Sequence, residues 1–131
     1  MKKGIKILLV ILIILAAIII AGTVTVKKLA GGLENFLAEV VIEPVDLKNL
    51  ADGTYPGKTD AGIIQVKLEV DVKDHRITDI RLLEHRNGQG GDAEELIPRI
   101  IAEQRVDVDT VSGATYSSLA ILDAVEGALK Q

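Results

Sequence analysis

An uncharged apolar run near the N-terminus, from Ile7 to Val26, constrains this chain more than any other feature. A helix rises about 1.5 Å per residue, so these 20 residues are long enough to cross the ~30 Å hydrocarbon core of a bilayer. A cleaved signal peptide is the alternative, but its apolar region spans about 7–15 residues and ends in small residues. This run stays β-branched through Thr23–Val26. We therefore expect a retained N-terminal transmembrane anchor over residues 1–28.

Charge divides the chain at the end of this run. The first 28 residues carry five lysines and no acid, whereas residues 29–131 hold ten Lys and Arg against nineteen Asp and Glu. Three lysines precede the run and two follow it, which predicts a cytoplasmic N-terminus and a domain on the extracytoplasmic side of a single-pass membrane protein. The acidic body repels phosphate backbones, and the three aromatic residues (Phe36, Tyr55 and Tyr116) provide no stacking surface, so we expect no nucleic-acid binding.

The chain contains no cysteine. This excludes disulfides, iron–sulfur ligation, thiolate zinc sites and covalent haem attachment. A redox function would therefore depend on an organic cofactor or on a partner protein.

Residues 29–51 read as a juxtamembrane connector. Ala30-Gly31-Gly32 predicts a flexible break, and Leu33, Phe36, Leu37 and Val40 then recur at helical spacing. We expect a short amphipathic helix that ends before Pro44 and rests on the domain or on the membrane surface, with partner binding as the alternative.

The remaining residues, 52–131, predict one α+β domain. Asp52–Gly57 is rich in turn-forming residues and marks its beginning. Apolar and polar residues alternate strictly over Ile64–Lys73, which indicates a strand with one solvated face. Asp74-His75 then supplies a tight turn, and Ile77–Leu82 returns as an antiparallel strand.

Two helices follow the hairpin. Asp92 and Glu95 have capping-box spacing and predict a helix start, although Pro98 requires either a kink or a later start. A final helix is expected over Tyr116–Lys130, with Leu122, Val125 and Leu129 buried and Asp123 and Glu126 facing outward. The predicted fold is therefore an antiparallel hairpin or sheet packed against two helices and preceded by one transmembrane helix.

The segment Asp109–Thr115 leads directly into this last helix and carries the chemistry. Ser112, Thr115 and Ser117 bring hydroxyls to a helix N-terminus, where free backbone N–H groups favour an anion. Gly113 permits a positive φ angle, and Ala114 adds little bulk, so Thr115 is expected to be accessible. Ordinary N-capping by Ser or Thr is the alternative at this point.

This segment resembles the flavinylation motif Asp-x-x-Ser/Thr-Gly-Ala-Thr of the FMN-binding domain family, with every motif position matched. Asp52-Gly53-x-Tyr55-x-Gly57 and Leu83-x-His85 are similar to flanking parts of the family, so the resemblance covers about residues 50–131. Small membrane-anchored members include the flavinylated subunits of ion-translocating NADH:quinone and ferredoxin-linked complexes.

The resemblance implies that FMN is attached through a phosphoester to Thr115 by a separate flavin transferase. It also implies cofactor-binding roles for Asp109, Ser112, Gly113 and Ala114, and for His85 as a residue lining the flavin. No base stands beside Thr115 in the sequence, and His85 is 30 residues away, so the chain is expected to be the substrate of the modifying enzyme. The implied function is an electron-transfer carrier or redox subunit, with membrane donor and acceptor proteins as partners, rather than a stand-alone enzyme.

The sequence is also compatible with two other functions. The same fold would serve as a module that holds FMN or another phosphate ligand noncovalently. It would also serve as an anchored interaction protein without a cofactor. Two roles are possible for Tyr55, stacking on the flavin or ordinary packing in the domain. Glu94 and Glu95 are most simply interpreted as the solvated face of a helix.

Overall fold

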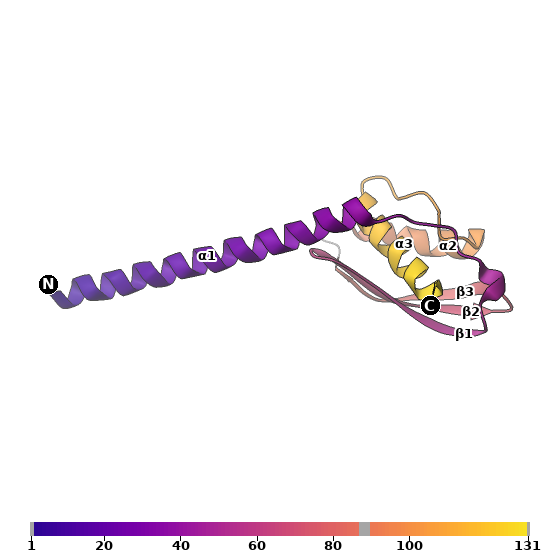
Figure 1. The fold of residues 1–131 in the computed structure, drawn as a ribbon, viewed down its shortest axis with the longest axis horizontal. Coiled ribbons are helices and arrows are strands. Elements are labelled where there is room, and N and C mark those ends of the chain that lie inside the picture. The colour runs from indigo at the N-terminus through magenta and orange to yellow at the C-terminus, as the bar shows by residue number, and fades with distance from the viewer. Residues whose placement is uncertain (1, 87–89, 131) are drawn as a thin grey trace.

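The apolar run lies in one continuous helix, α1 (Lys2–Glu39), which projects from an α+β domain (Figure 1). The computed structural model describes residues 2–86 and 90–130. Within these ranges α1 is the one helix long and apolar enough to span a membrane, and none of its residues is buried by the protein. Thr23 and Thr25 donate their hydroxyls to the carbonyls of Ile20 and Ala21, so the polar groups of the run are satisfied inside the helix.

The expected break at Ala30-Gly31-Gly32 is wrong, because α1 passes through these residues without interruption. A glycine in a helix costs about 1 kcal/mol relative to alanine, but packing outweighs this propensity here. Leu33 and Phe36 lie against the hydrophobic core of the domain, as expected for an amphipathic segment that rests on the domain. The apolar run and the segment that packs on the domain therefore belong to one helix.

Three antiparallel strands form the sheet in the order β1-β2-β3. They are β1 (Gly53–Ala61), β2 (Ile64–Lys73) and β3 (Arg76–Arg86). The predicted hairpin of β2 and β3 is confirmed, and its turn residues Asp74 and His75 have φ angles of 52° and 62°. Both angles are left-handed, as a two-residue turn of this kind requires, and Asp and His tolerate that region better than most residues.

The sequence did not predict β1. Its residues include Gly53, Pro56 and Gly57, which are typical of turns, and they show no apolar alternation. The strand forms at the edge of the sheet, where proline is tolerated, and pairs with β2 along its whole length. Gly57 is required by packing, since a Cβ there would collide with the carbonyl oxygen of Ala124.

The segment after β3 differs from the predicted capping box. A 3-10 helix, η2 (Gly91–Glu95), precedes α2 (Leu96–Glu103), and neither start receives a side-chain cap from the described residues. Asp92 therefore does not cap a helix. Pro98 lies in the first turn of α2, where a missing N–H group removes no intrahelical bond, so the later start is the correct alternative.

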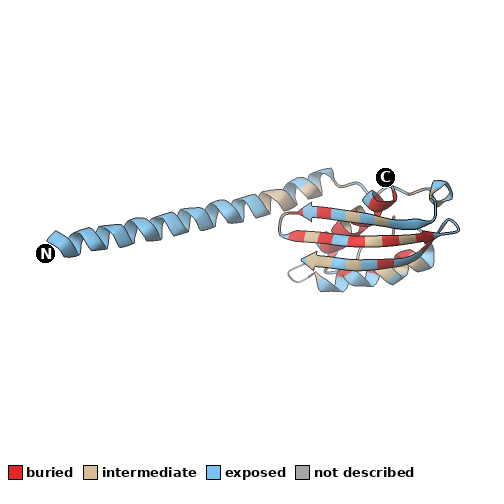
Figure 2. Ribbon diagram, turned by 90° about the horizontal axis from the view of Figure 1, so that it is seen from below, coloured by how far each residue is buried: buried red, intermediate tan, exposed pale blue. Residues whose placement is uncertain are grey.

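All helices of the domain cover one face of the sheet, and the other face is open (Figure 2). The last helix, α3 (Thr115–Leu129), lies across β1 and β2 and matches its predicted extent within one residue at each end. Leu122, Val125 and Leu129 are buried as expected.

Two side chains of α3 expected to face outward do not. Glu126 is buried and accepts a hydrogen bond from Lys130, whereas Asp123 is half-buried and accepts one of 2.6 Å from the Thr59 hydroxyl. The missed strand β1 and the segment after α1 pack beside the faces of α3 that carry these two carboxylates.

Candidate functional site

The loop before α3 ends in a sharp change of backbone direction at Gly113, whose φ angle is +80°. A Cβ at this position would meet no atom within 4 Å, so glycine is required by the backbone conformation and not by space. Ala114 follows with its side chain buried, and its N–H donates to the carbonyl of Val111 at 3.0 Å. The turn therefore buries Ala114 and leaves its neighbours Ser112 and Thr115 exposed.

Thr115 is the first residue of α3, and the helix begins without a side-chain cap from the described part of the chain. Ala114 occupies the N-cap position, where Ser, Thr or Asp would normally accept a bond from the first N–H groups. The ordinary N-capping alternative is therefore wrong for Ser112 and Thr115. The free N–H groups and the positive end of the helix dipole remain directed at the exposed loop, an arrangement suited to a phosphate.

Two hydroxyls lie beneath this helix start. Ser117 and Ser118 are both buried. The Oγ of Ser118 accepts a 3.0 Å hydrogen bond from the N–H of Val111, which ties the loop to the first turn of α3. The Oγ of Ser117 has no hydrogen-bond partner among the described residues, and a buried hydroxyl in that state favours binding of a further polar group.

Arg99 holds the other end of the loop. Its Nη1 donates a 3.0 Å hydrogen bond to the backbone carbonyl of Asp109. This contact could not be predicted from the sequence, because Arg99 lies ten residues upstream on α2 and has no motif spacing to the loop. The side chain of Asp109 is exposed and thus accessible to a modifying enzyme.

Asp109 also belongs to a charged group at this end of the loop. The pKa of Arg105 is raised, chiefly by its hydrogen bond with Glu103, and the negative charges of Asp107 and Asp109 add to the shift. The exposed loop therefore has negative charge at its beginning and an anion-favouring helix start at its end.

His85 lies near the end of β3, and its side chain is 2% exposed. Its Nδ1 is 3.0 Å from Oε1 of Glu94 in η2, and η2 in turn packs against α3. The structure therefore links His85 to the helix that begins at Thr115 through one intervening element. Of the Gly88–Gly91 loop expected beside the flavin, residues 88 and 89 lie outside the described residues.

The aromatic residues have different positions. Tyr55 packs against the core and donates its hydroxyl to the carbonyl of Ala51 at 2.6 Å, which favours the packing role. Tyr116 stands exposed immediately after Thr115, and no pattern in the sequence pointed to a function for it. His75 is a turn residue, as expected.

The fold and the site define a small α+β module with a helix start that no described side chain caps, an exposed threonine and a buried hydroxyl beneath them. The model of the FMN-binding domain family matches residues 61–130, more than half of the chain, and the protein belongs to this family. No curated protein is similar enough in sequence to count as a relative. The matched range includes β2, β3 and the complete loop before α3, so FMN is the cofactor of this domain.

The described residues fit an FMN phosphate. The N–H groups at the start of α3 supply donors, Gly113 allows close approach, and the hydroxyl of Ser117 supplies a buried polar partner. Bound FMN supplies reversible one- or two-electron redox chemistry, whereas the protein holds the group and tunes its surroundings.

Proposed function

We propose that FMN is held covalently, through a phosphoester between its phosphate and Oγ of Thr115. The observation that carries this proposal is the position of Thr115: exposed, first in α3, and directly beside N–H groups that no described side chain caps. A phosphate esterified to this hydroxyl would lie at the positive end of the helix. The match of Asp109, Ser112, Gly113 and Ala114 to the flavinylation motif supports the same residue.

The attachment requires a separate transferase and an activated flavin donor. The bond from Thr115 Oγ to the FMN phosphorus forms, the bond from that phosphorus to the donor's leaving group breaks, and the hydroxyl proton passes to a base of the transferase. Within the described residues, no side chain forms a hydrogen bond with the hydroxyl of Thr115 that would activate it as a nucleophile. The protein's own contribution is to present an accessible hydroxyl on a rigid turn.

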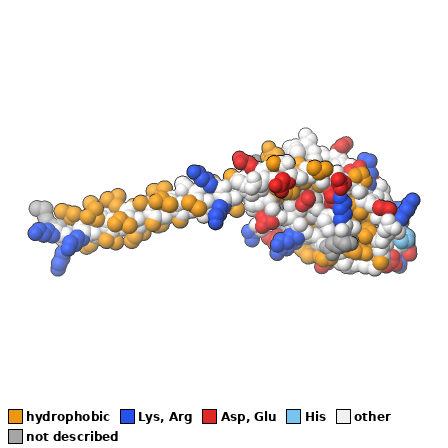
Figure 3. Space-filling view, in the orientation of Figure 1, with side chains coloured by type: hydrophobic (Ala, Val, Ile, Leu, Met, Phe, Trp, Pro, Cys, Tyr) orange, Lys and Arg blue, Asp and Glu red, His pale blue; other side chains and the backbone are white. Residues whose placement is uncertain are grey.

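The attached flavin would act as an extracytoplasmic electron carrier on a membrane. The 20-residue apolar run of α1 is exposed along its length and has lysines at both ends, whereas acidic residues are concentrated on the domain (Figure 3). This distribution supports a retained anchor with a domain that exchanges electrons with membrane donor and acceptor proteins.

The intact mass of the full chain, purified from cells that co-express an active flavin transferase, tests the attachment. The expected result is a mass gain of one FMN less one water, which survives denaturation. Thr115→Ala should abolish the gain completely. Thr110→Ala is the matched control, because Thr110 lies in the same loop but outside the motif positions, and it should be modified like the wild type.

A noncovalent FMN module would give a different pattern. The protein would be yellow when native, would lose the flavin on denaturation, and would show the unmodified mass in all three variants. That pattern, with the transferase active on another substrate, would exclude the covalent attachment while leaving FMN binding intact.

A further inference from the structure

Helix α1 meets the domain through a direct backbone contact with the turn between β1 and β2. A Cβ built on Gly32 would lie 3.1 Å from Cα of Gly62, and one on Gly62 would collide with the carbonyl oxygen of Leu29. Gly62 also has a φ angle of +77°. We call this contact of Leu29, Gly32 and Gly62 the junction. The contact is close because both segments have glycine there.

The junction lies very near the end of the apolar run. Leu29 is three residues beyond Val26, which corresponds to about 5 Å along the helix axis. The headgroup layer on each side of a bilayer is about 5–8 Å thick, so the junction falls at that level when the run fills the hydrocarbon core. Ile63, at the tip of the same turn, is 49% exposed. An exposed isoleucine at this level would contact lipid.

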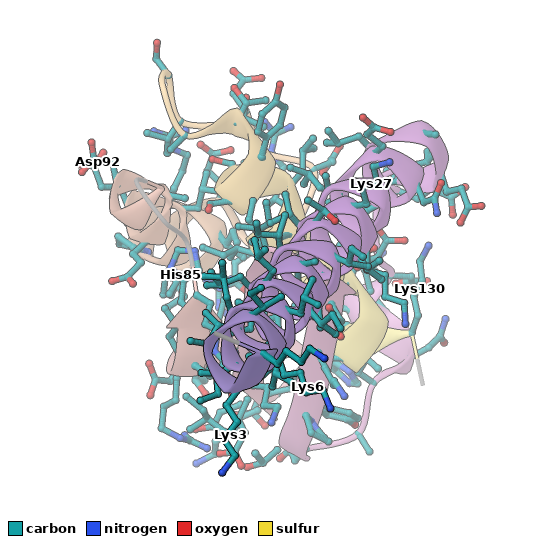
Figure 4. The ribbon with its side chains drawn as sticks, turned by 90° about the vertical axis from the view of Figure 1, so that its left-hand side faces the viewer. Lys3, Lys6, Lys27, His85, Asp92 and Lys130 are labelled. Atoms are coloured by element: carbon teal, nitrogen blue, oxygen red, sulfur yellow. The ribbon has the colours of Figure 1, made fainter. Side chains whose placement is uncertain are left out.

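The opposite end of the sheet points away from the membrane. β2 has ten residues, so the turn at Asp74-His75 lies about 33 Å from the turn at Gly62. Viewed from its N-terminal end, helix α1 overlies the domain, with His85 on one side of the helix in this view and Lys130 on the other (Figure 4). Beyond the junction the helix continues to pack on the domain as far as Phe36.

The loop that carries Thr115 belongs to the end of the domain near the junction. Val66 pairs with His85 next to the β1–β2 turn, and η2 follows β3 at that end. Along β1, Gly57 contacts Ala124 and Thr59 bonds to Asp123, so α3 runs toward the junction as it is followed back to its first residue.

We propose that the β1–β2 turn is seated in the lipid headgroup layer and is held there by the junction, so that the domain meets the bilayer with its flavin-bearing end. This inference rests on the proposed membrane anchor. It assigns the turn, and Ile63 in particular, to contact with phospholipid. A flexible tether, by contrast, would let the domain tumble above the surface.

The absence of cysteine allows single-cysteine fluorescence on the full chain in vesicles of phosphatidylcholine and phosphatidylglycerol. Three positions are labelled with an environment-sensitive dye: Ile14→Cys in the run, Ile63→Cys in the turn and His75→Cys at the far end. We expect quenching of position 63 by a nitroxide on the lipid headgroup, none at position 75, and quenching of position 14 by a nitroxide on the acyl chain.

Variants of α1 then test the cause. Gly32→Leu should abolish the quenching at position 63, whereas Gly31→Leu, which meets no atom within 4 Å at its Cβ, should preserve it. Circular dichroism checks that Gly32→Leu folds. A Gly-Ser-Gly-Ser insertion between Lys28 and Leu29 leaves the junction intact but frees the domain, and it should also abolish the quenching.

Three outcomes would overturn the proposal, and each is distinguishable from the others. Quenching at position 14 without quenching at position 63 would leave the anchor in place and refute the seated turn. No quenching at position 14 would refute the anchor itself, and the seating with it. Quenching at position 63 that survives the insertion would show that the turn is not held in the headgroup layer by the continuous helix α1.

Discussion

The backbone N–H of Val111 donates a 3.0 Å hydrogen bond to Oγ of Ser118, seven residues further along the chain. This bond joins the beginning of the turn before Thr115 to the first turn of α3. The conformation that exposes Thr115 therefore depends on a buried hydroxyl on the far side of the turn, as well as on the motif residues themselves.

Ser118→Ala removes the hydroxyl that accepts this bond, so the partly buried N–H of Val111 loses its acceptor. The expected loss is about 1–3 kcal/mol in the free energy of unfolding, with slower flavin attachment because the turn loosens. Ser112→Ala, at an exposed position of the same turn, should change stability by less than about 0.5 kcal/mol. Urea denaturation in detergent measures the difference, and equal losses in the two variants would contradict the role of Ser118.

Gly113→Ala and Gly127→Ala make the same substitution at two exposed glycines, and we expect the first to lower the stability of the fold and the second to raise it. At Gly113 the φ angle of +80° strains any other residue, so stability should fall by about 1–2 kcal/mol. Gly127 lies inside α3 with no atom within 4 Å of a Cβ and no positive φ angle, so alanine there should stabilise by about 0.5–1 kcal/mol. Thermal unfolding of both variants measures these changes. Stabilisation by Gly113→Ala would show that residue 113 does not need a positive φ angle.

Lys130 joins α3 to the segment after α1. Its Nζ donates to Glu126 at 2.6 Å and to Glu43 at 2.8 Å. The hydrogen bond with Glu126 and then that with Glu43 raise the pKa of Lys130 above its ordinary value of 10.5. The bond from Lys130 lowers the pKa of Glu43 below 4.5.

The pH dependence of Lys130→Met follows from these two shifts. A raised lysine pKa stabilises the fold fully below 10.5, and the effect is lost as the pH rises through the raised value. A lowered carboxyl pKa stabilises above 4.5, and the effect is lost as the pH falls through the lowered value. The stability difference between wild type and Lys130→Met should therefore be greatest between pH 4.5 and 10.5 and shrink outside that window. Lys73→Met, at an exposed site on β2, is the control and should show no such window.

The proposed membrane orientation predicts a labelling asymmetry. In intact cells, a membrane-impermeant maleimide should label Lys73→Cys in the domain but not Lys3→Cys before the apolar run. Permeabilisation should make both reactive. Protection of position 73 until permeabilisation would place the domain in the cytoplasm, where the flavin would have different redox partners.

Much of the fold could be predicted because local patterns agree with the final packing. The alternation over Ile64–Lys73 predicts a strand with one buried face. The tight turn that follows forms because Asp74 and His75 tolerate the left-handed backbone conformation that it requires. The residue pattern before the last helix likewise predicted Thr115 at a helix start, and α3 begins there.

Other features have no local signature. β1 contains Pro56 and Gly57 and becomes a strand because β2 offers a free edge and α3 approaches closely enough to require glycine. Gly31-Gly32 resembles a hinge in the sequence, yet the helix continues because Gly32 packs on Gly62, thirty residues away. Arg99 and Ser118 act on the loop through contacts that spacing does not reveal.

The sequence by itself determined the long apolar helix, the β2–β3 hairpin, the last helix and the residue proposed to carry the flavin. Each of these depends on periodicity, turn chemistry or a motif, and these act over a few neighbouring residues. Only the tertiary structure decided that Asp123 and Glu126 are partnered and that no described side chain caps the start of α3. It also decided that α1 continues without a break through Gly31 and Gly32 onto the domain. These features depend on which distant segments pack together, because packing energies outweigh the smaller local preferences of glycine, proline and charged residues.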